Sequence, residues 1–442
     1  MNRISRRQFL KYSALMSASA TAPVFLGGCA VNPVTGRTQL MMVSRQQEIE
    51  LDKKQSPFQF SSDYGITQDK KINQYMSCVG EKLLANVQRP DMPYNFQCVN
   101  ATYINAYAFP GGSIAATRGI LLKLENEAQL ASLLGHELGH VNARHTAEQI
   151  SKGRLSSLIV GGLTLAASYR GEGLGEIAQK LGMLGQGLLL SKYSRDNERQ
   201  ADTLGNEYMV EAGYSSRGFT GLMEMLNSLH KEQPSSVKIL FSSHPMSSER
   251  LNSALQREKG IYRYTKDYPI NRERYMDNMA SLFKKKEGIK LLQQGEKYLE
   301  KKDYEEAGNI FKKSLKKLKN DYTAHVLMSK CLMIREKPAK ALIHANIAKK
   351  LYPSEVQAYH IAGIANIKLK QYTKAYKDFC KSDELLPGNP QMTFYKGYCL
   401  DKQGNPKPAA RNYMTYLKMI NYKSGKYSRY AYNRLKQWGY AK

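Results

Sequence analysis

Two histidines and a glutamate in residues 136–140 have the spacing of a metal-binding helix. The segment reads H-E-L-G-H, so His136 and His140 are four residues apart and share one face of a helix. Two imidazoles placed in this way can bind one Zn²⁺ ion, and Glu137 between them can take a proton from water at the metal. Apolar residues recur at helical intervals through residues 127–149, which predicts an amphipathic helix with one buried apolar face.

A second segment, residues 193–202, offers the missing acidic ligand. It reads Y-S-R-D-N-E-R-Q-A-D and predicts a helix with Glu198 and Asp202 on one face. We expect Glu198 to be the third ligand. Asp202 lies one turn further, where it can hold a ligand histidine's other nitrogen or assist a proton transfer. The alternative is a solvated acidic helix face. With three protein ligands, the sequence favours a hydrolytic site that binds one Zn²⁺ per chain.

One further histidine stands ahead of a predicted helix. Pro245 holds His244 in an extended conformation, outside any helix. From this loop His244 could approach the zinc as a displaceable fourth ligand, and a purely structural loop histidine is the alternative. His145 is five residues from His140 and should lie off the ligand face. We assign it to the background with the remaining histidines, which are His230, His325, His344 and His360.

The first residues predict export. The segment S-R-R-Q-F-L-K at residues 5–11 matches a twin-arginine signal, and L-G-G-C at residues 26–29 is similar to a bacterial lipobox. We therefore expect a signal peptide over residues 1–28 and a lipid on Cys29, with a plain cleaved signal or an uncleaved anchor as the alternative. Ala30 after the cysteine hints at the outer membrane. No later run reaches the roughly 18–20 apolar residues of a membrane span. The chain should be lipid-anchored at the periplasmic face of the envelope.

Charge and cysteine content add weaker constraints. The net charge is +28, and most of it lies after residue 280. This basic half could meet acidic lipids, acidic clients or nucleic acid, but scattered lysines favour a solvated surface, and export excludes nucleic acid as a partner.

The chain has six cysteines, of which five remain available for disulfides once Cys29 carries lipid. Cys78 could pair with Cys98, or two of the last three could pair, although most are expected to be small buried residues.

The elements that must position the site are helices and a small sheet. Helical periods run through residues 45–54 and 69–84, and residues 94–99 alternate like a strand. Residues 105–117 predict a strand, a glycine turn and a second strand directly before the metal-binding helix. The polar residues 29–44 suit a tether that ends in an apolar docking segment.

A 34-residue period begins near residue 288. Small and large residues recur at this interval, at Gly295, Ser329, Gly363 and Gly397, at Ala307, Ala341, Ala375 and Ala409, and at Phe311, Ala345, Phe379 and Tyr413. This pattern matches the tetratricopeptide repeat, in which small residues let paired helices approach. Four repeats over residues 288–423 would form a superhelix that binds peptides or partner proteins, with a capping segment at residues 424–442.

Together these motifs resemble the HtpX-like and CAAX-prenyl-protease-like zinc metallopeptidases, and within them the exported branch of the beta-barrel assembly-enhancing proteases. The resemblance rests on N-P-V-T-G at residues 32–36, on residues 105–117, on the two ligand helices, on the His-Pro pair and on the repeats. It implies a mainly α (α+β) fold, with a gluzincin-like zinc peptidase domain at residues 45–270 and an α-solenoid behind it. In such peptidases an edge strand beside the metal pairs with extended substrate, and an ordinary hairpin is the alternative for residues 105–117.

The resemblance also implies roles for single residues. His136, His140 and Glu198 correspond to the zinc ligands and Glu137 to the catalytic base. Asp202 corresponds to a proton donor, His244 to a histidine that caps the zinc and keeps the enzyme latent, and Arg250 to its neighbour on the next helix.

The implied function is a zinc-dependent endopeptidase of the bacterial envelope. It would hydrolyse misfolded or misassembled proteins, with outer-membrane protein assembly as one context, and the repeats would recruit the clients. A chaperone or assembly scaffold with a structural or latent zinc is the alternative, against which the intact Glu137 argues. A lipase-like or amidase hydrolase is less favoured, because no serine nucleophile motif is evident. The predicted lipobox departs from the soluble relatives, so their location and partners do not transfer.

Overall fold

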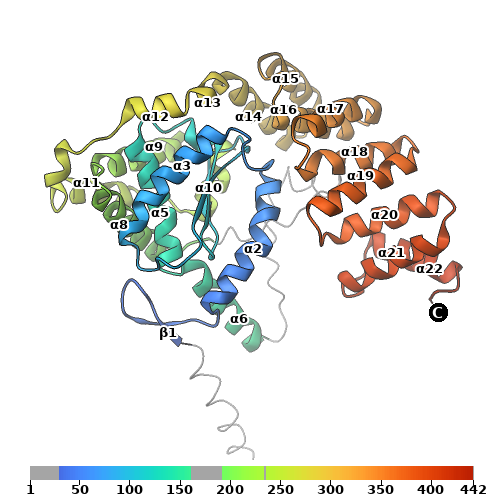
Figure 1. The fold of residues 1–442 in the computed structure, drawn as a ribbon, viewed down its shortest axis with the longest axis horizontal. Coiled ribbons are helices and arrows are strands. Elements are labelled where there is room, and N and C mark those ends of the chain that lie inside the picture. The colour runs from blue at the N-terminus through green and yellow to red at the C-terminus, as the bar shows by residue number, and fades with distance from the viewer. Residues whose placement is uncertain (1–28, 161–191, 233–234, 442) are drawn as a thin grey trace, which may run out of the picture.

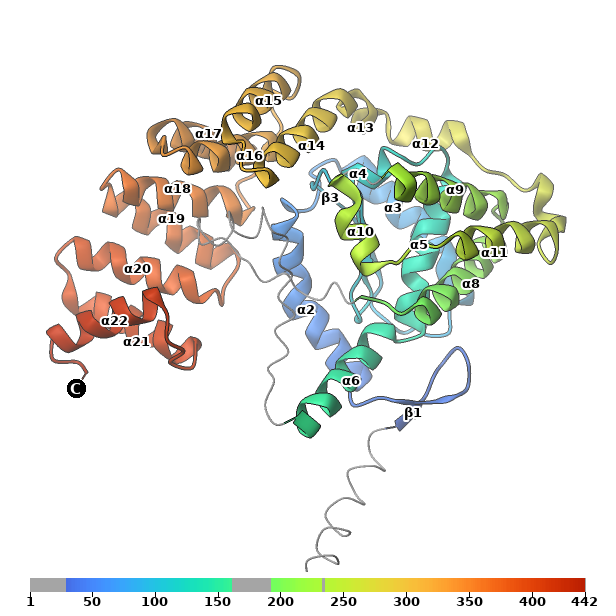
Figure 2. The same ribbon diagram turned by 180° about the vertical axis from the view of Figure 1, so that it is seen from behind.

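The computed structural model describes residues 29–160, 192–232 and 235–441, and the predicted export signal at residues 1–28 lies outside them. The chain is mainly helical with small sheets, as expected. Its N-terminal part surrounds a central helix, and its C-terminal part is an arc of paired helices that runs beside the first part (Figures 1 and 2). Among the described helices, none combines the length and apolarity needed to cross a membrane.

Three short strands form the sheet beside the central helix. β3 (Asn95–Val99) pairs in parallel with β5 (Ser113–Thr117), and β4 (Ala106–Ala108) pairs with β5 in antiparallel orientation. The sheet order is β3-β5-β4, so β4 lies at an edge. Gly112, at φ 107°, makes the turn between β4 and β5 with a backbone conformation that favours glycine. The predicted strand and the predicted strand–turn–strand segment are confirmed.

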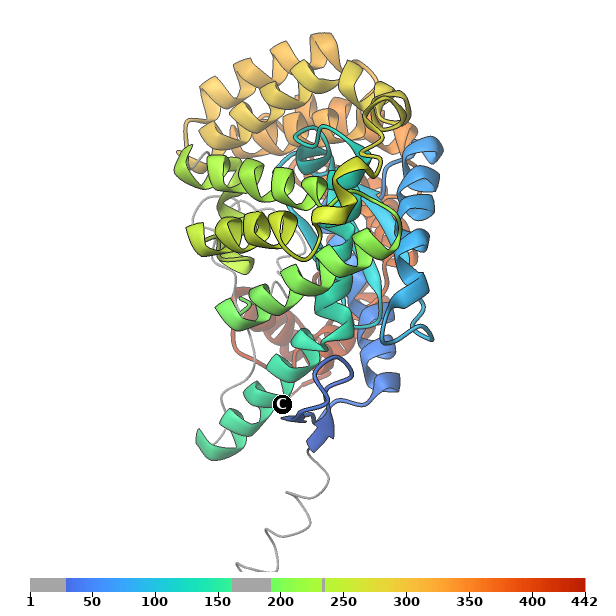
Figure 3. The same cartoon turned by 90° about the vertical axis from the view of Figure 1, so that its left-hand side faces the viewer.

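The central helix is α5 (Glu127–Asn142), which packs along α8 (Arg195–Glu211). Asn126 caps α5 by accepting the N–H of Gln129, and a capping box at Ser194 begins α8. Every residue of α5 is buried. Figure 3 shows why: α8, α9 and α11, in green, lie on one side of α5, and α2 and α3, in blue, lie on the other. The predicted single buried face is therefore wrong.

The other helices of the N-terminal part enclose this pair. The predicted helices over residues 45–54 and 69–84 are both present, and the first is longer than expected. The elements are α2 (Arg45–Ser62), α3 (Lys70–Lys82), η1 (Leu83–Asn86), α4 (Arg118–Leu121), α6 (His145–Val160), α9 (Arg217–Glu232), η2 (Ser235–Val237), α10 (Lys238–Ser243), α11 (Ser248–Lys259), η3 (Arg263–Asp267), α12 (Arg272–Asn278) and α13 (Ala280–Lys284).

The segment predicted as a tether, residues 29–44, folds onto the N-terminal part of the molecule. It forms a hairpin of β1 (Cys29–Val31) and β2 (Thr38–Leu40). Directly after the hairpin, Met41 and Val43 are buried in a small cluster with Ala147 of α6. The expected apolar docking segment is thus present, and it docks beside the start of α6.

The 34-residue period corresponds to successive helix pairs. In three units a Cβ added to the small residue would lie within 3 Å of the aromatic ring of its partner, in the pairs Gly295–Phe311, Gly363–Phe379 and Gly397–Tyr413. The helices are α14 (Lys286–Glu300), α15 (Tyr304–Lys317), α16 (Tyr322–Ile334), α17 (Pro338–Leu351), α18 (Val356–Lys368), α19 (Tyr372–Leu385), α20 (Pro390–Lys402), α21 (Pro406–Met419) and α22 (Lys426–Gln437). The α-solenoid is confirmed, whereas the predicted boundaries of all domains stay predictions.

The arc and the N-terminal part share a buried polar contact surface. Arg118 pairs with Asp321 across it at 2.6 Å, and both side chains are buried. The Ser61 hydroxyl donates to Glu355 at 2.5 Å. Cys78 is exposed and Cys98 is buried, and neither forms a disulfide. The same holds for Cys331, Cys380 and Cys399, so the possible disulfides are not formed here.

Candidate metal centre

Four buried side chains converge beside the crossing of α5 and α8. The ligand atoms of His136, His140, Glu198 and His244 all lie within 4.8 Å of one another. The Nε2 atoms of the first two histidines are 3.1 Å apart, and Nε2 of His140 is 3.4 Å from Oε1 of Glu198. Nδ1 of His244 lies 3.1 Å from the same oxygen and 3.4 Å from Nε2 of His136. Tetrahedral zinc with ligands at about 2.0–2.1 Å places them about 3.3 Å apart, so this donor set fits zinc.

Close helix packing creates this convergence. A Cβ added to Gly205 of α8 would lie 2.6 Å from the backbone nitrogen of His136, and one added to Gly135 would lie 2.8 Å from the carbonyl of Gly205. Both glycines therefore let the helix backbones touch. Glu198 in the first turn of α8 can then reach the two histidines of α5.

The loop histidine enters from a third element. His244 ends α10, and its backbone N–H donates to the carbonyl of Leu240 at 2.7 Å. Its conformation, at φ −115° and ψ 86°, is non-helical, as expected for a residue before proline. The side chain is buried at the fourth position of the cluster. The structure thus places His244 where the displaceable-ligand prediction requires it.

Glu137 lies on α5, and its carboxylate faces His244. Its Oε1 atom is 3.9 Å from Nε2 of His244, and its Oε2 atom is buried without a hydrogen-bond partner. Burial raises the pKa of Glu137, and the nearby His244 and His136 offset part of this increase. A carboxylate with a raised pKa is suited to take and return a proton near neutral pH.

A small apolar hollow opens beside these groups. Besides His136, Glu137, His244 and Arg250, it is lined by Ile120, Leu133, Leu222, Met223, Leu226, Leu240, Phe241 and Met246. Exclusion of water from such a lining strengthens the electrostatic interactions of the buried charges.

Asp202 and Arg250 form the next layer of the centre. Asp202 Oδ1 lies 3.0 Å from Nδ1 of His136, on the ring edge away from the cluster. The Arg250 guanidinium donates to both Asp202 oxygens at 2.7 Å, and its Nη1 lies 2.7 Å from Oε2 of Glu198. Burial raises the pKa of Asp202, but Arg250 outweighs burial and leaves it at about 2. Asp202 thus lies in contact with the other nitrogen of His136, while its expected roles in holding that ring and in proton transfer stay predictions.

Three residues around His140 were missed by the sequence analysis, and two of them contact its ring. His145 Nδ1 lies 2.9 Å from His140 Nδ1, and His145 Nε2 lies 2.9 Å from Oε1 of Gln200. The Tyr193 ring stacks on the His140 ring with centroids 3.7 Å apart. The assignment of His145 to the background is therefore wrong. It assumed one continuous helix, but α5 ends at Asn142 and Arg144, at φ 59°, breaks the helix before α6.

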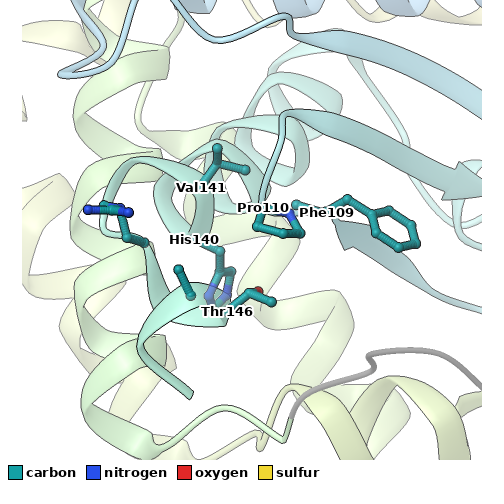
Figure 4. Close-up of a pocket in the computed structure, with 8 residues that line it drawn as sticks. Phe109, Pro110, His140, Val141 and Thr146 are labelled. Carbon is teal, nitrogen blue, oxygen red and sulfur yellow. The ribbon is translucent and has the colours of Figure 1, made fainter. Parts of the chain in front are cut away.

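A second, narrow hollow without room for a water molecule lies over His140, between the turn after β4 and the junction of α5 with α6. Figure 4 shows Pro110 of that turn facing His140, with Thr146 close to the imidazole ring. The edge strand β4 contacts α5 beside this hollow. Pairing of an extended peptide with this edge stays a prediction.

Comparison with known proteins agrees with the geometry. The beta-barrel assembly-enhancing protease of Yersinia pestis is 28% identical over 194 residues, which cover 43% of this chain and 39% of that protein. The chain thus spans less than half of that relative. The metalloprotease YcaL of Escherichia coli K12 is 26% identical over 259 residues, or 54% of this chain and 95% of that protein. Among solved structures, MamA has 20% identity and a TM-score of 0.32, covering 35% of this chain and 83% of that chain. Residues 70–258 match the model of peptidase family M48, and the chain therefore carries a metallopeptidase domain of this family.

Proposed function

We propose that the chain is a zinc-dependent endopeptidase. The observation that carries the proposal is the set of four buried donors, whose ligand atoms all lie within 4.8 Å of one another, beside a buried glutamate with one unpartnered oxygen. His136, His140 and Glu198 would hold the ion. Bound zinc would polarise the scissile carbonyl and bring the pKa of a bound water toward about 7.

The residues of this chain perform the remaining work. Glu137 accepts a proton from the attacking water at its unpartnered Oε2 and returns it to the leaving amine. Asp202 holds His136 in place through Nδ1, and Arg250 balances the negative charges of Asp202 and Glu198. The apolar hollow beside Glu137 excludes bulk water from this proton transfer.

His244 controls access to the reaction. Because its Nδ1 atom stands among the other three donors, it fills the position that water or substrate needs. We expect low basal activity until a client or partner displaces this side chain. The short helix α10 before it and Pro245 after it offer the hinge for such a displacement.

The setting and the clients are part of the proposal. Relatives named beta-barrel assembly-enhancing protease support work on misfolded or misassembled proteins in the cell envelope. The arc of repeats, which lies beside the metallopeptidase domain, would recruit protein clients (Figure 1). A lipid on Cys29 would tether the chain to the periplasmic face of a membrane, with the outer membrane favoured, after twin-arginine export. Nucleic acid is not a proposed partner.

The test combines metal content with casein cleavage for the purified mature chain. We expect one zinc per chain in wild type, loss of cleavage by about 10²-fold or more in Glu137→Gln, and higher cleavage in His244→Ala. His344→Ala, which changes a histidine of the repeats, should match wild type. Absence of zinc from wild type would overturn the metal site, and full cleavage by Glu137→Gln would overturn the assigned base.

A chaperone or assembly scaffold is the second candidate, and the filled fourth position is the observation in its favour. A site closed by His244 could serve to hold α5, α8 and α10 together. The discriminating experiment expresses Glu137→Gln in a strain that lacks the protein. Full rescue would favour the scaffold, whereas failure to rescue at equal protein level would favour the peptidase.

A further inference from the structure

His140 has a buried hydrogen-bond chain behind it that nothing in the proposed catalysis uses. One hydrogen bond joins His140 Nδ1 to His145 Nδ1 at 2.9 Å, and the next joins His145 Nε2 to Gln200 Oε1 at 2.9 Å. His145 is 1% exposed. Its partner Gln200 belongs to α8, the helix that also carries Glu198, so the chain links two ligand-bearing helices on the side away from the metal.

We propose that His145 is a positioning residue that fixes the orientation and the tautomer of His140 and thereby strengthens metal binding. The inference rests on the proposed zinc site. It concerns a side chain that is not a ligand and that lies on α6, a different helix from any ligand.

The direction of each hydrogen bond follows from the partners. His140 faces the other donors through Nε2, so in the metal-binding state its Nδ1 carries the hydrogen and donates. His145 must then accept at Nδ1, which leaves its own hydrogen on Nε2. That hydrogen points to the Gln200 side-chain carbonyl, which accepts. The three groups thus define one tautomer for each ring, and a ligand that donates in this way is a more basic ligand.

The backbone around His145 is built to hold it there. Arg144, in a left-handed conformation, breaks the helix between α5 and α6, and its guanidinium donates to Glu48 at 3.1–3.2 Å, where Glu48 is fully buried. On the other side of the His140 ring, Tyr193 stacks at 3.7 Å while its hydroxyl lies 3.1 Å from Thr146 Oγ1. The ligand ring is therefore held at its edge by His145 and on its face by Tyr193.

The experiment measures zinc affinity by competition with a chromophoric chelator, and the visible absorption spectrum after loading with Co²⁺. His145→Leu removes the acceptor, and His145→Asn keeps an acceptor oxygen near the position of Nδ1. We expect zinc binding to weaken about 10–100-fold in His145→Leu, with a changed cobalt spectrum, and to recover most of that loss in His145→Asn. The matched control is His344→Leu, which breaks a contact of the same kind, a 3.0 Å contact between the Nδ1 atoms of His325 and His344 in the repeats.

Gln200 keeps the test decisive if His145→Leu does not fold. Its side chain is half-buried, and Gln200→Leu leaves His145 without its orienting acceptor, whereas Gln200→Glu keeps one. We expect weaker zinc binding in the first of these variants alone. Wild-type affinity in His145→Leu, or equal loss in His145→Leu and His145→Asn, would overturn the inference. Failure of the wild type to bind zinc would instead overturn the proposed function.

Discussion

Arg250 holds together two carboxylates that would otherwise repel each other inside the protein. Its guanidinium contacts Asp202 and Glu198, and all three side chains are buried. A guanidinium suits this place because it stays protonated and presents several donors in a fixed plane. Burial raises the pKa of Glu198, but Arg250 and His244 outweigh burial and hold it well below its usual range. The ligand carboxylate is therefore ionised before any metal arrives.

The lowered pKa of Asp202 makes a prediction about stability without metal. The folded pKa of about 2 lies below the ordinary value of 3.8, so the ionised carboxylate stabilises the fold above pH 4 and this contribution fades as the pH falls toward 2. In the chelator-treated protein, we expect Asp202→Asn to lower the free energy of unfolding by about 2 kcal/mol at pH 7. Urea denaturation across this pH range measures the difference between the two proteins.

The control for this prediction is a carboxylate on the same helix. Asp196 is exposed and pairs with Arg199 at the surface, so Asp196→Asn should change the free energy of unfolding by at most about 0.5 kcal/mol. A loss in Asp202→Asn that stayed constant from pH 7 to pH 2 would contradict the assigned cause.

At the residue scale, spacing predicted the side chains that converge but not the residues that surround them. His136, Glu137 and His140 follow from one helical period, and Glu198 follows from a second motif, because each motif is local in sequence. His145 could not be predicted, since its position depends on a left-handed residue between two helices. No local pattern reveals that the helix breaks there, although the positive φ is explained afterwards by the contacts of Arg144.

At the element scale, the glycines between α5 and α8 set the spacing of the metal centre. Gly135 and Gly205 face each other, and any Cβ at either position would meet the backbone of the other helix. The two histidines and Glu198 converge only because these helices lie so close. Sequence periodicity describes one helix at a time, which explains why it predicted α5 but not its burial on every side.

This contact predicts the effect of one added methyl group. Gly205→Ala must push α8 away from the His136 backbone, so we expect a loss of about 1–3 kcal/mol in the free energy of unfolding and weaker zinc binding. Thermal melting and chelator competition measure the two effects.

Gly221 of α9 supplies a matched control for that substitution. A Cβ at this position would approach only the end of the flexible Gln129 side chain, which can move aside. Gly221→Ala should therefore leave zinc binding unchanged and gain up to about 1 kcal/mol from helix propensity. Unchanged zinc binding in Gly205→Ala would show that helix spacing does not limit the site.

At the scale of the whole molecule, buried charge joins the repeats to the metallopeptidase domain. Arg118 and Asp321 lie far apart in the sequence and form a buried pair at 2.6 Å. Asp321 also caps α16 by accepting the N–H of Ala324. The 34-residue period predicted the solenoid because each repeat contacts its neighbours, but it contains no information on how the solenoid docks.

Breaking this pair should weaken both parts of the molecule. Asp321→Asn keeps the helix cap but leaves the Arg118 charge buried without its partner, so we expect a loss of about 3–5 kcal/mol in the free energy of unfolding. Far-UV circular dichroism reports the whole chain. Fluorescence of the single tryptophan, Trp438 of the capping segment, which stacks on Tyr413, reports the last repeat and its cap. Both transitions should shift to lower urea concentration.

Glu384→Gln is the comparison for this variant. Glu384 pairs with Lys381 on the exposed surface of α19, where loss of an ion pair costs at most about 1 kcal/mol. A shift of the circular dichroism transition alone in Asp321→Asn, with unchanged tryptophan fluorescence, would mean that the last repeat unfolds independently of the docked surface.

Nearly the whole of α16 is buried, although the inner helices of a solenoid ordinarily offer a free groove. The metallopeptidase domain contacts the start of this helix through Arg118 and the Asn100 carbonyl. It therefore occupies the groove of the second repeat. The helices α20 and α22 lie at the end of the array that is remote from this contact (Figure 2). The second repeat thus supports the metallopeptidase domain. Adding repeats at the C-terminal end, away from this contact, would enlarge the array without disturbing the metal centre.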